Sequence, residues 1–191
     1  LVLRRQRQMC IRDSYQIQNS QNLPDFFMSI VGSDDHWMFV SSRGALTAGR
    51  RNPDGALFPY AADDQISAKQ STTGPISIFR FNAGGNSEST TWIPWLDSTG
   101  RNSGIARAVY KSPWGSKVLF EETHLASRLR FRYRWSFSPR FGFIRDCWLT
   151  NLSDEACNVT WLDGLQNLLP VGVGSDCLLY TSDAADEERG V

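Results

Sequence analysis

The clearest pattern in the chain is a strict alternation of apolar and basic positions in "RLRFRYRWSF", residues 128–137. Because successive side chains of a β-strand point to opposite faces of a sheet, this period of two predicts a strand with one apolar and one basic face. The apolar positions are Leu129, Phe131, Tyr133, Trp135 and Phe137. The arginines between them could bind an anion, but we expect them to be solvated or paired with acids, their stems covering neighbouring side chains.

Seven further segments have the composition of strands, and turn-forming sequences separate them. They are residues 36–42, 76–81, 90–95, 106–112, 117–126, 141–151 and 157–165. Many short strands joined by connections rich in Gly, Pro, Ser and Asn, with little helical period, predict an all-β fold, an antiparallel β-sandwich. No repeat of fixed period is apparent, which argues against a propeller or a solenoid.

Two pairs of these segments are expected to form hairpins. The first is "VYKSPWGSKVLF", with Pro and Gly in its turn, and the second turns at Ser153–Asp154. The register of the second hairpin places Cys147 and Cys157 on opposite faces of the sheet, about three rungs apart, which is too far for a disulfide. We therefore expect both thiols to be free, so they say nothing about an oxidising compartment.

The two ends of the chain do not fit the strand pattern. Residues 1–14 and 177–191 can be encoded by one DNA sequence read in opposite directions, and "RRQRQMCIRDS" and "CLLYTSDAADE" resemble the translated transposase adapter used to prepare sequencing libraries. We expect both ends to be adapter that packs against nothing, the alternative being a basic arm and an acidic tail. Residues 15–176 would then be an incomplete β-sandwich domain, an internal piece of a longer reading frame whose localisation is unknown.

Composition narrows the function of residues 15–176. The chain has 20 Lys plus Arg and 20 Asp plus Glu, and the two ends remove equal numbers of each, so the remainder is neutral. A neutral surface argues against a nucleic-acid or anionic-membrane partner, and no apolar run approaches the roughly 20 residues of a membrane span. The remaining Cys and His residues lack metal-ligand spacing, and "NAGGNS" lacks the Lys of a phosphate-binding loop, so we expect no metal and no cofactor.

Acidic residues occur in doublets, and a glycosidase needs two carboxyl groups that face each other across a sugar. Adjacent residues on a strand point to opposite faces, so neither member of a doublet can partner the other. We therefore predict no catalytic residue here, and treat these positions as turn, cap or solvated residues that can at most contact a ligand or a neighbouring domain. The acidic candidates are Asp34, Asp35, Asp63, Asp64, Glu121, Glu122 and Asp163, and His36 and Arg43 join them as candidate contacts.

Tryptophan is the other candidate for ligand contact, because aromatic rings stack on the apolar faces of sugars. Most tryptophans of a sandwich lie in its core, and we expect this of Trp135. Trp114 lies in a tight turn beside Pro113 and is the ring we most expect to be exposed. It is therefore the best single candidate for a ligand or domain contact.

A family resemblance rests on two stretches. Residues 144–170, "IRDCWLTNLSDEACNVTWLDGLQNLLP", and residues 34–66 resemble the N-terminal β-supersandwich domain that precedes an (α/α)6 barrel in cellobiose phosphorylase-type enzymes and related glycoside hydrolases. The matching positions are Arg43, Asn52, Pro53, Leu57, Phe58, Pro59, Tyr60, Asp63 and Asp64. In that family the catalytic groups lie in the helical barrel.

The resemblance implies a non-catalytic domain of a large bacterial enzyme, in the cytoplasm or the periplasm. Its partners would be a C-terminal (α/α)6 domain and, through the parent enzyme, an oligo- or polysaccharide. An apolar surface left by the absent partner would favour this interpretation. The alternative is a free-standing carbohydrate-binding or structural β-sandwich, which an exposed aromatic strip on one sheet would favour.

Overall fold

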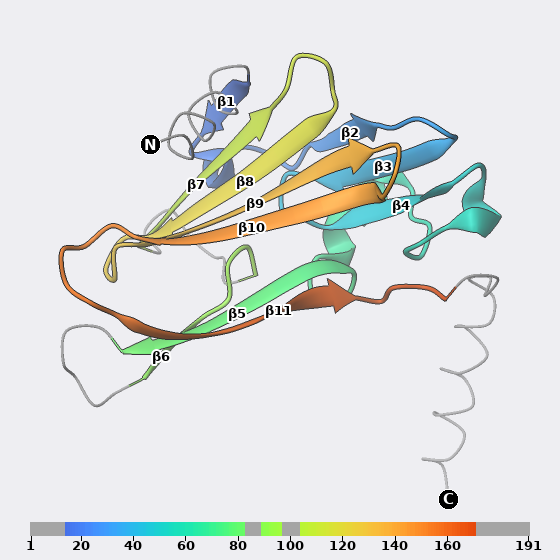
Figure 1. Cartoon of the computed structure of the whole chain (residues 1–191). Helices are drawn as coiled ribbons and strands as arrows, with labels where there is room; N and C mark the ends of the chain where they lie inside the picture. The colour runs from blue at the N-terminus through green and yellow to red at the C-terminus, as the bar shows by residue number, and fades with distance from the viewer. Residues whose placement is uncertain (1–13, 83–88, 97–103, 171–191) are drawn as a thin grey trace, which may run out of the picture.

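The computed structural model describes residues 14–82, 89–96 and 104–170, which form three antiparallel sheets (Figure 1). The largest sheet has the order β1-β7-β8-β9-β10 and consists of Tyr15–Gln18, Ile105–Lys111, Lys117–His124, Leu129–Ser138 and Gly142–Asn151. The second has the order β11-β5-β6 and consists of Asn158–Gln166, Gly74–Asn82 and Thr90–Trp92. The third, β2-β3-β4, consists of Phe27–Val31, His36–Ser41 and Leu46–Arg50.

In the part of the chain that the structure describes, helical structure is limited to short turns in the connections. These turns are η1, Ser20–Asn22; η2, Pro53–Gly55; α2, Asp63–Ile66; and η3, Ser67–Lys69. The fold is therefore all-β and sandwich-like, as the sequence predicted. Within the described ranges, no helix is both long and apolar enough to span a membrane.

One hydrophobic core joins the three sheets, and the alternation in residues 128–137 builds its centre. Leu129, Phe131, Tyr133 and Trp135 are all buried and share one cluster with side chains of β2–β8. The opposite face is paired with acids: Arg132 binds Glu121 of β8, and Arg134 binds Asp146 of β10. The expectation of an acid-paired basic face is confirmed.

The eight predicted strands are all present, and their bounds lie within two residues of the prediction except in β6. β6 ends at Trp92 rather than residue 95, because Pro94 cannot donate to a ladder and the chain turns there, with Trp95 at a φ of 71°. The sequence reasoning missed β1, β2 and β4. Pattern reading fails on these strands because they are only 4 or 5 residues long, and β2 in addition does not alternate between apolar and polar residues.

The first predicted hairpin is confirmed and the second is wrong. β7 and β8 pair around the turn that contains Trp114. β10, however, pairs with β9, and β11 pairs with β5 of another sheet, so the 152–157 segment crosses between sheets, as Figure 1 shows. In this arrangement the ring of Trp161 of β11 packs on Phe79, with 5.3 Å between the ring centroids, while the indole stays 40% exposed.

Cys147 and Cys157 are both free, as expected, but for a different reason. Cys147 lies on β10 of the largest sheet, and Cys157 directly precedes β11 of the second sheet. The two residues therefore do not lie on opposite faces of one hairpin. Residues 1–14 and 177–191, which we expect to pack against nothing, lie outside the described residues apart from Ser14, so this expectation stays a prediction.

Candidate functional site

Aromatic side chains line the outer face of the β2-β3-β4 sheet. Val31 is paired with Trp37, and Ser29 is paired with Phe39, and paired residues project to the same side of a sheet. This side is opposite to the one that carries the buried Met38 and Val40. We call the set formed by the exposed Phe27, Val31, Phe39 and Tyr60 and the half-buried Trp37 the aromatic face.

Trp37 is the centre of the aromatic face. Its ring lies 6.2 Å from that of Phe39 and meets the ring of Tyr60 edge-on at 5.9 Å, both distances between ring centroids. Phe39 is 36% exposed and Tyr60 is 51% exposed. Gly49, the cross-strand partner of Trp37, makes room for the indole, since a Cβ there would lie 2.4 Å from Trp37 Cζ2.

Trp114 lies at the β2 edge of this sheet and is 84% exposed, which confirms the expectation that its ring is exposed. The amide of Val31 donates to the carbonyl of Gly115 at 2.9 Å, so the turn that carries Trp114 is fixed to the end of β2. The 32–35 turn follows directly. Its Asp34 and Asp35 are exposed and have φ angles of 57° and 60°, which Asp tolerates better than most residues.

His36 is close to these residues in the chain but is a packing residue. Its Nδ1 lies 2.9 Å from the carbonyl oxygen of Ser33, and its ring packs against both Phe137 and Phe143, at 5.1 and 5.8 Å between centroids. These contacts hold the start of β3 against the end of the largest sheet. Trp114, Asp34, Asp35 and His36 thus gather at one end of β2 and β3, but they form no catalytic arrangement that we can identify.

The other sequence-predicted residues lie elsewhere. Arg43 forms an exposed ion pair with Asp25, with Nε and Oδ1 2.6 Å apart. Asp63 and Asp64 begin α2, and their side chains lie outside what the structure describes. Asp163 of β11 accepts from Ser77 Oγ and from an Arg145 Nη, at 2.5 and 2.7 Å, so it links β11 to β5 and β10.

The Glu121–Glu122 doublet is split across the sheet, as predicted. Glu122 is fully buried, while its neighbour Glu121 pairs with Arg132 on the other face. The Glu122 carboxylate accepts from Trp92 Nε1 at 2.8 Å, and from the Trp95 amide and Arg107 Nε at 2.7 Å each. Burial raises the pKa of Glu122, against the opposing effects of Arg107 and these hydrogen bonds. The Glu122 carboxylate thus fixes β6 and the turn after β6 to the largest sheet.

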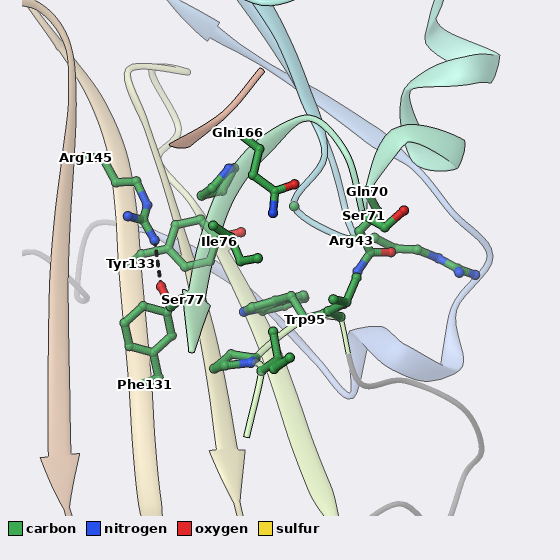
Figure 2. Close-up of a pocket in the computed structure, with 15 residues that line it drawn as sticks. Arg43, Gln70, Ser71, Ile76, Ser77, Trp95, Phe131, Tyr133, Arg145 and Gln166 are labelled. Carbon is green, nitrogen blue, oxygen red and sulfur yellow. Dashed lines mark hydrogen bonds between the residues drawn. The ribbon is translucent and has the colours of Figure 1, made fainter. Parts of the chain in front are cut away.

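A polar pocket is the feature that sequence reasoning missed entirely. Tyr133, Trp95, Arg145, Gln70 and Gln166 line it, from segments far apart in the chain (Figure 2). Alternation placed Tyr133 in the core but could not show that these other side chains meet it there. Among the described residues, no group of three or more His, Cys, Asp and Glu side chains could hold a metal ion.

A scan against models of known protein families finds no match, and a search of curated proteins finds none either.

Proposed function

We propose that residues 15–176 are a non-catalytic β-sandwich of a large bacterial carbohydrate-active enzyme, of the glycoside phosphorylase or hydrolase type. The sandwich packs against a helical (α/α)6 catalytic domain and reaches its oligo- or polysaccharide through that domain. Two features support this proposal: long sheet edges without a partner, and the structural use of the candidate carboxylates.

The sheet edges carry the proposal. Among the described strands, the ten-residue β10 pairs only with β9, and the nine-residue β11 pairs only with β5. Leu162 of β11 is 60% exposed, and Leu165 and Leu168 are 42% and 54% exposed. A long edge strand with exposed leucines is a template for unwanted pairing, and proteins commonly cover such an edge with another element. A neighbouring domain would supply this cover.

The carboxylates support the non-catalytic part of the proposal. Asp163 is bound by Ser77 and Arg145, and Glu122 is buried under three hydrogen bonds. Asp34 and Asp35 form a turn at the far end of a different sheet. A hydrolase needs a facing pair of carboxyl groups with room for a sugar between them. The described acids serve pairing and turns instead.

The test is the behaviour of the chain without a partner. We expect the unaltered chain to bind a hydrophobic dye and to show self-association in light scattering. The double variant Leu162→Lys, Leu168→Lys should reduce both dye binding and self-association. Leu125→Lys is the matched control, because Leu125 is 54% exposed but lies in the turn between β8 and β9 and not on an edge strand. A monodisperse monomer that binds no dye would contradict the proposal.

The second candidate is a free-standing carbohydrate-binding module, and the aromatic face favours it. Tyr60 and Phe39 present exposed rings around Trp37, and such rings can stack on pyranose faces. The test is affinity electrophoresis in gels that contain soluble glucans. Tyr60→Ala with Phe39→Ala should abolish retardation, and Tyr15→Ala should leave it unchanged. If no glucan retards the unaltered chain, this candidate fails while the first remains.

A further inference from the structure

An apolar pocket of about 210 Å³ lies where the three sheets meet. β3 supplies Met38, β9 supplies Trp135 and β11 supplies Leu165, so each sheet contributes to its lining. The floor of the pocket is buried, since Met38, Phe58 and Trp135 are at most 3% exposed. Its mouth is open to solvent, because Phe141 and Leu165 are 69% and 42% exposed.

Backbone hydrogen bonds hold the walls of the apolar pocket in place. The amides of Leu57 and Phe58 both donate to the Ala48 carbonyl, at 2.8 and 3.3 Å, which fixes their loop to β4. The amide of Leu169 donates to the Leu57 carbonyl at 2.8 Å, which fixes the segment after β11 to the same loop. Leu57 and Leu168 both line the pocket. The pocket is therefore formed within this chain, as preformed ligand sites are.

The size and lining of the apolar pocket favour one aromatic ring. An apolar cavity of about 150 Å³ holds one benzene molecule, and the remaining volume fits roughly two more heavy atoms at about 30 Å³ each. A ligand of roughly eight heavy atoms therefore matches the pocket. Aromatic side chains and a thioether, which both pack well on an aromatic ring, make up half of the lining. They are Phe58, Trp135, Phe141, Phe143 and Met38.

His36 supplies one hydrogen-bond acceptor to this lining. Its Nδ1 lies 2.9 Å from the carbonyl oxygen of Ser33, so Nδ1 carries the hydrogen of the neutral ring and Nε2 keeps a lone pair. Nε2 lies on the pocket side, because a Cβ built on Gly142, which also lines the pocket, would lie 3.8 Å from it. Trp135 Nε1 is fully buried and so does not face the open space.

One acceptor in an apolar lining selects a ligand with one donor. The hydroxyl of a phenol can donate to His36 Nε2 while its ring contacts the aromatic side chains. A pyranose does not fit this lining, because most of its hydroxyl groups would lose their partners in water without gaining new ones. The pocket is thus unsuited to the sugar that the aromatic face could bind.

We propose that the apolar pocket binds a single phenolic ring of about eight heavy atoms, whose hydroxyl donates to His36 Nε2. The ring belongs either to a free phenol or to a tyrosine side chain, which share this chemistry. The pocket is built within this chain, so the inference goes beyond the proposed function and does not depend on a partner domain.

The experiment is saturation-transfer difference NMR with p-cresol on the full chain, at pH 8, where an imidazole is neutral. We expect saturable binding with a dissociation constant on the order of 0.1–1 mM, as small ligands with few contacts show. The saturated analogue 4-methylcyclohexanol has the same hydroxyl but no aromatic ring, so it should bind more weakly. N-acetyltyrosinamide distinguishes the two sources: affinity equal to that of p-cresol assigns a tyrosine side chain, and weaker binding assigns a free phenol.

Two variants locate the ring and its hydroxyl. Phe141→Ala removes an aromatic ring at the mouth and should weaken p-cresol binding about twofold to tenfold, whereas Phe27→Ala, on β2, should not. His36→Phe keeps a ring against Phe137 but removes the acceptor. The affinity for p-cresol relative to toluene should therefore fall about threefold to tenfold in His36→Phe, the value of one hydrogen bond. His124→Phe, at the other histidine of the chain, should leave this ratio unchanged.

Four outcomes would overturn the proposal: no saturable binding of p-cresol, equal binding in Phe141→Ala, an unchanged ratio in His36→Phe, or displacement of p-cresol by glucose. Far-UV circular dichroism first verifies that His36→Phe is folded. If it does not fold, Phe141→Ala decides, because that side chain is exposed and its loss leaves the core intact. A chain that self-associates without binding p-cresol contradicts this inference alone, and a monodisperse chain that binds p-cresol contradicts the proposed function alone.

Discussion

Replacing Glu122 by Gln should be among the most damaging single changes in this chain. The substitution removes the charge that compensates Arg107, whose side chain is only 7% exposed. It also turns one carboxylate oxygen into an amide nitrogen. If that nitrogen takes the Oε2 position, it faces the Trp95 amide and Arg107 Nε, so donors oppose donors. Breaking one side of a buried ion pair costs about 3–5 kcal/mol, a large part of the 5–15 kcal/mol that stabilises a typical domain.

Glu121→Gln is the matched control, because it makes the same change at the next position of β8. Glu121 and Arg132 are 13% and 23% exposed, so water partly screens their ion pair and the expected cost is smaller than that of Glu122→Gln. Urea unfolding followed by far-UV circular dichroism measures both, since the Trp92 contact would distort a fluorescence signal. Arg107→Met with Glu122→Leu should be more stable than Glu122→Gln, because no charge is left buried. Equal destabilisation by Glu121→Gln and Glu122→Gln would refute the reasoning.

Three further predictions concern other buried groups. Gly44→Ala should destabilise the fold by more than Gly104→Ala. Both glycines have a positive φ, where alanine costs about 1–2 kcal/mol, but only at position 44 would the new Cβ clash with Tyr133. Equal midpoints of urea unfolding for the two variants would contradict this. Burial lowers the pKa of His124, so His124 is protonated more readily in the unfolded chain than in the folded one. The free energy of unfolding should therefore fall as the pH drops below about 6.5. In thermal unfolding measured across pH, His124→Asn should reduce this pH dependence. Burial raises the pKa of the Cys147 thiol to about 12, so iodoacetamide at pH 8 should alkylate it far more slowly than a free cysteine, and mass spectrometry that found equal rates would refute the prediction.

The sequence predicted those parts of the fold that depend on a local period. β7, β8 and β9 alternate or join through a tight turn, so their existence and pairing follow from nearest neighbours in the chain. The partner of β10 could not be predicted in this way, because hairpins with β9 and with β11 are both locally possible. The observed pairing places Trp161 against Phe79, a contact between residues far apart in the chain that local pattern does not reveal.

The same distinction applies to the candidate sites. Turn chemistry predicted that Trp114 is exposed, since Pro113 and Gly115 flank it. Glu122 could have been predicted as buried, because it continues the every-second-residue phase of Val118 and Phe120. The aromatic face and the polar pocket could not, because each joins strands to side chains of distant loops, such as Tyr60.

The crossing from β10 to β11 has a consequence for how this chain acquires its structure. β5 pairs with β11, and β7, β8, β9 and β10 all lie between them in the chain. During synthesis, one edge of β5 therefore stays unpaired until β11, the last described strand, has left the ribosome. Such non-local pairing slows folding and prolongs exposure to aggregation. We therefore expect the second sheet to form last, and its formation to be the folding step that depends most on a chaperone.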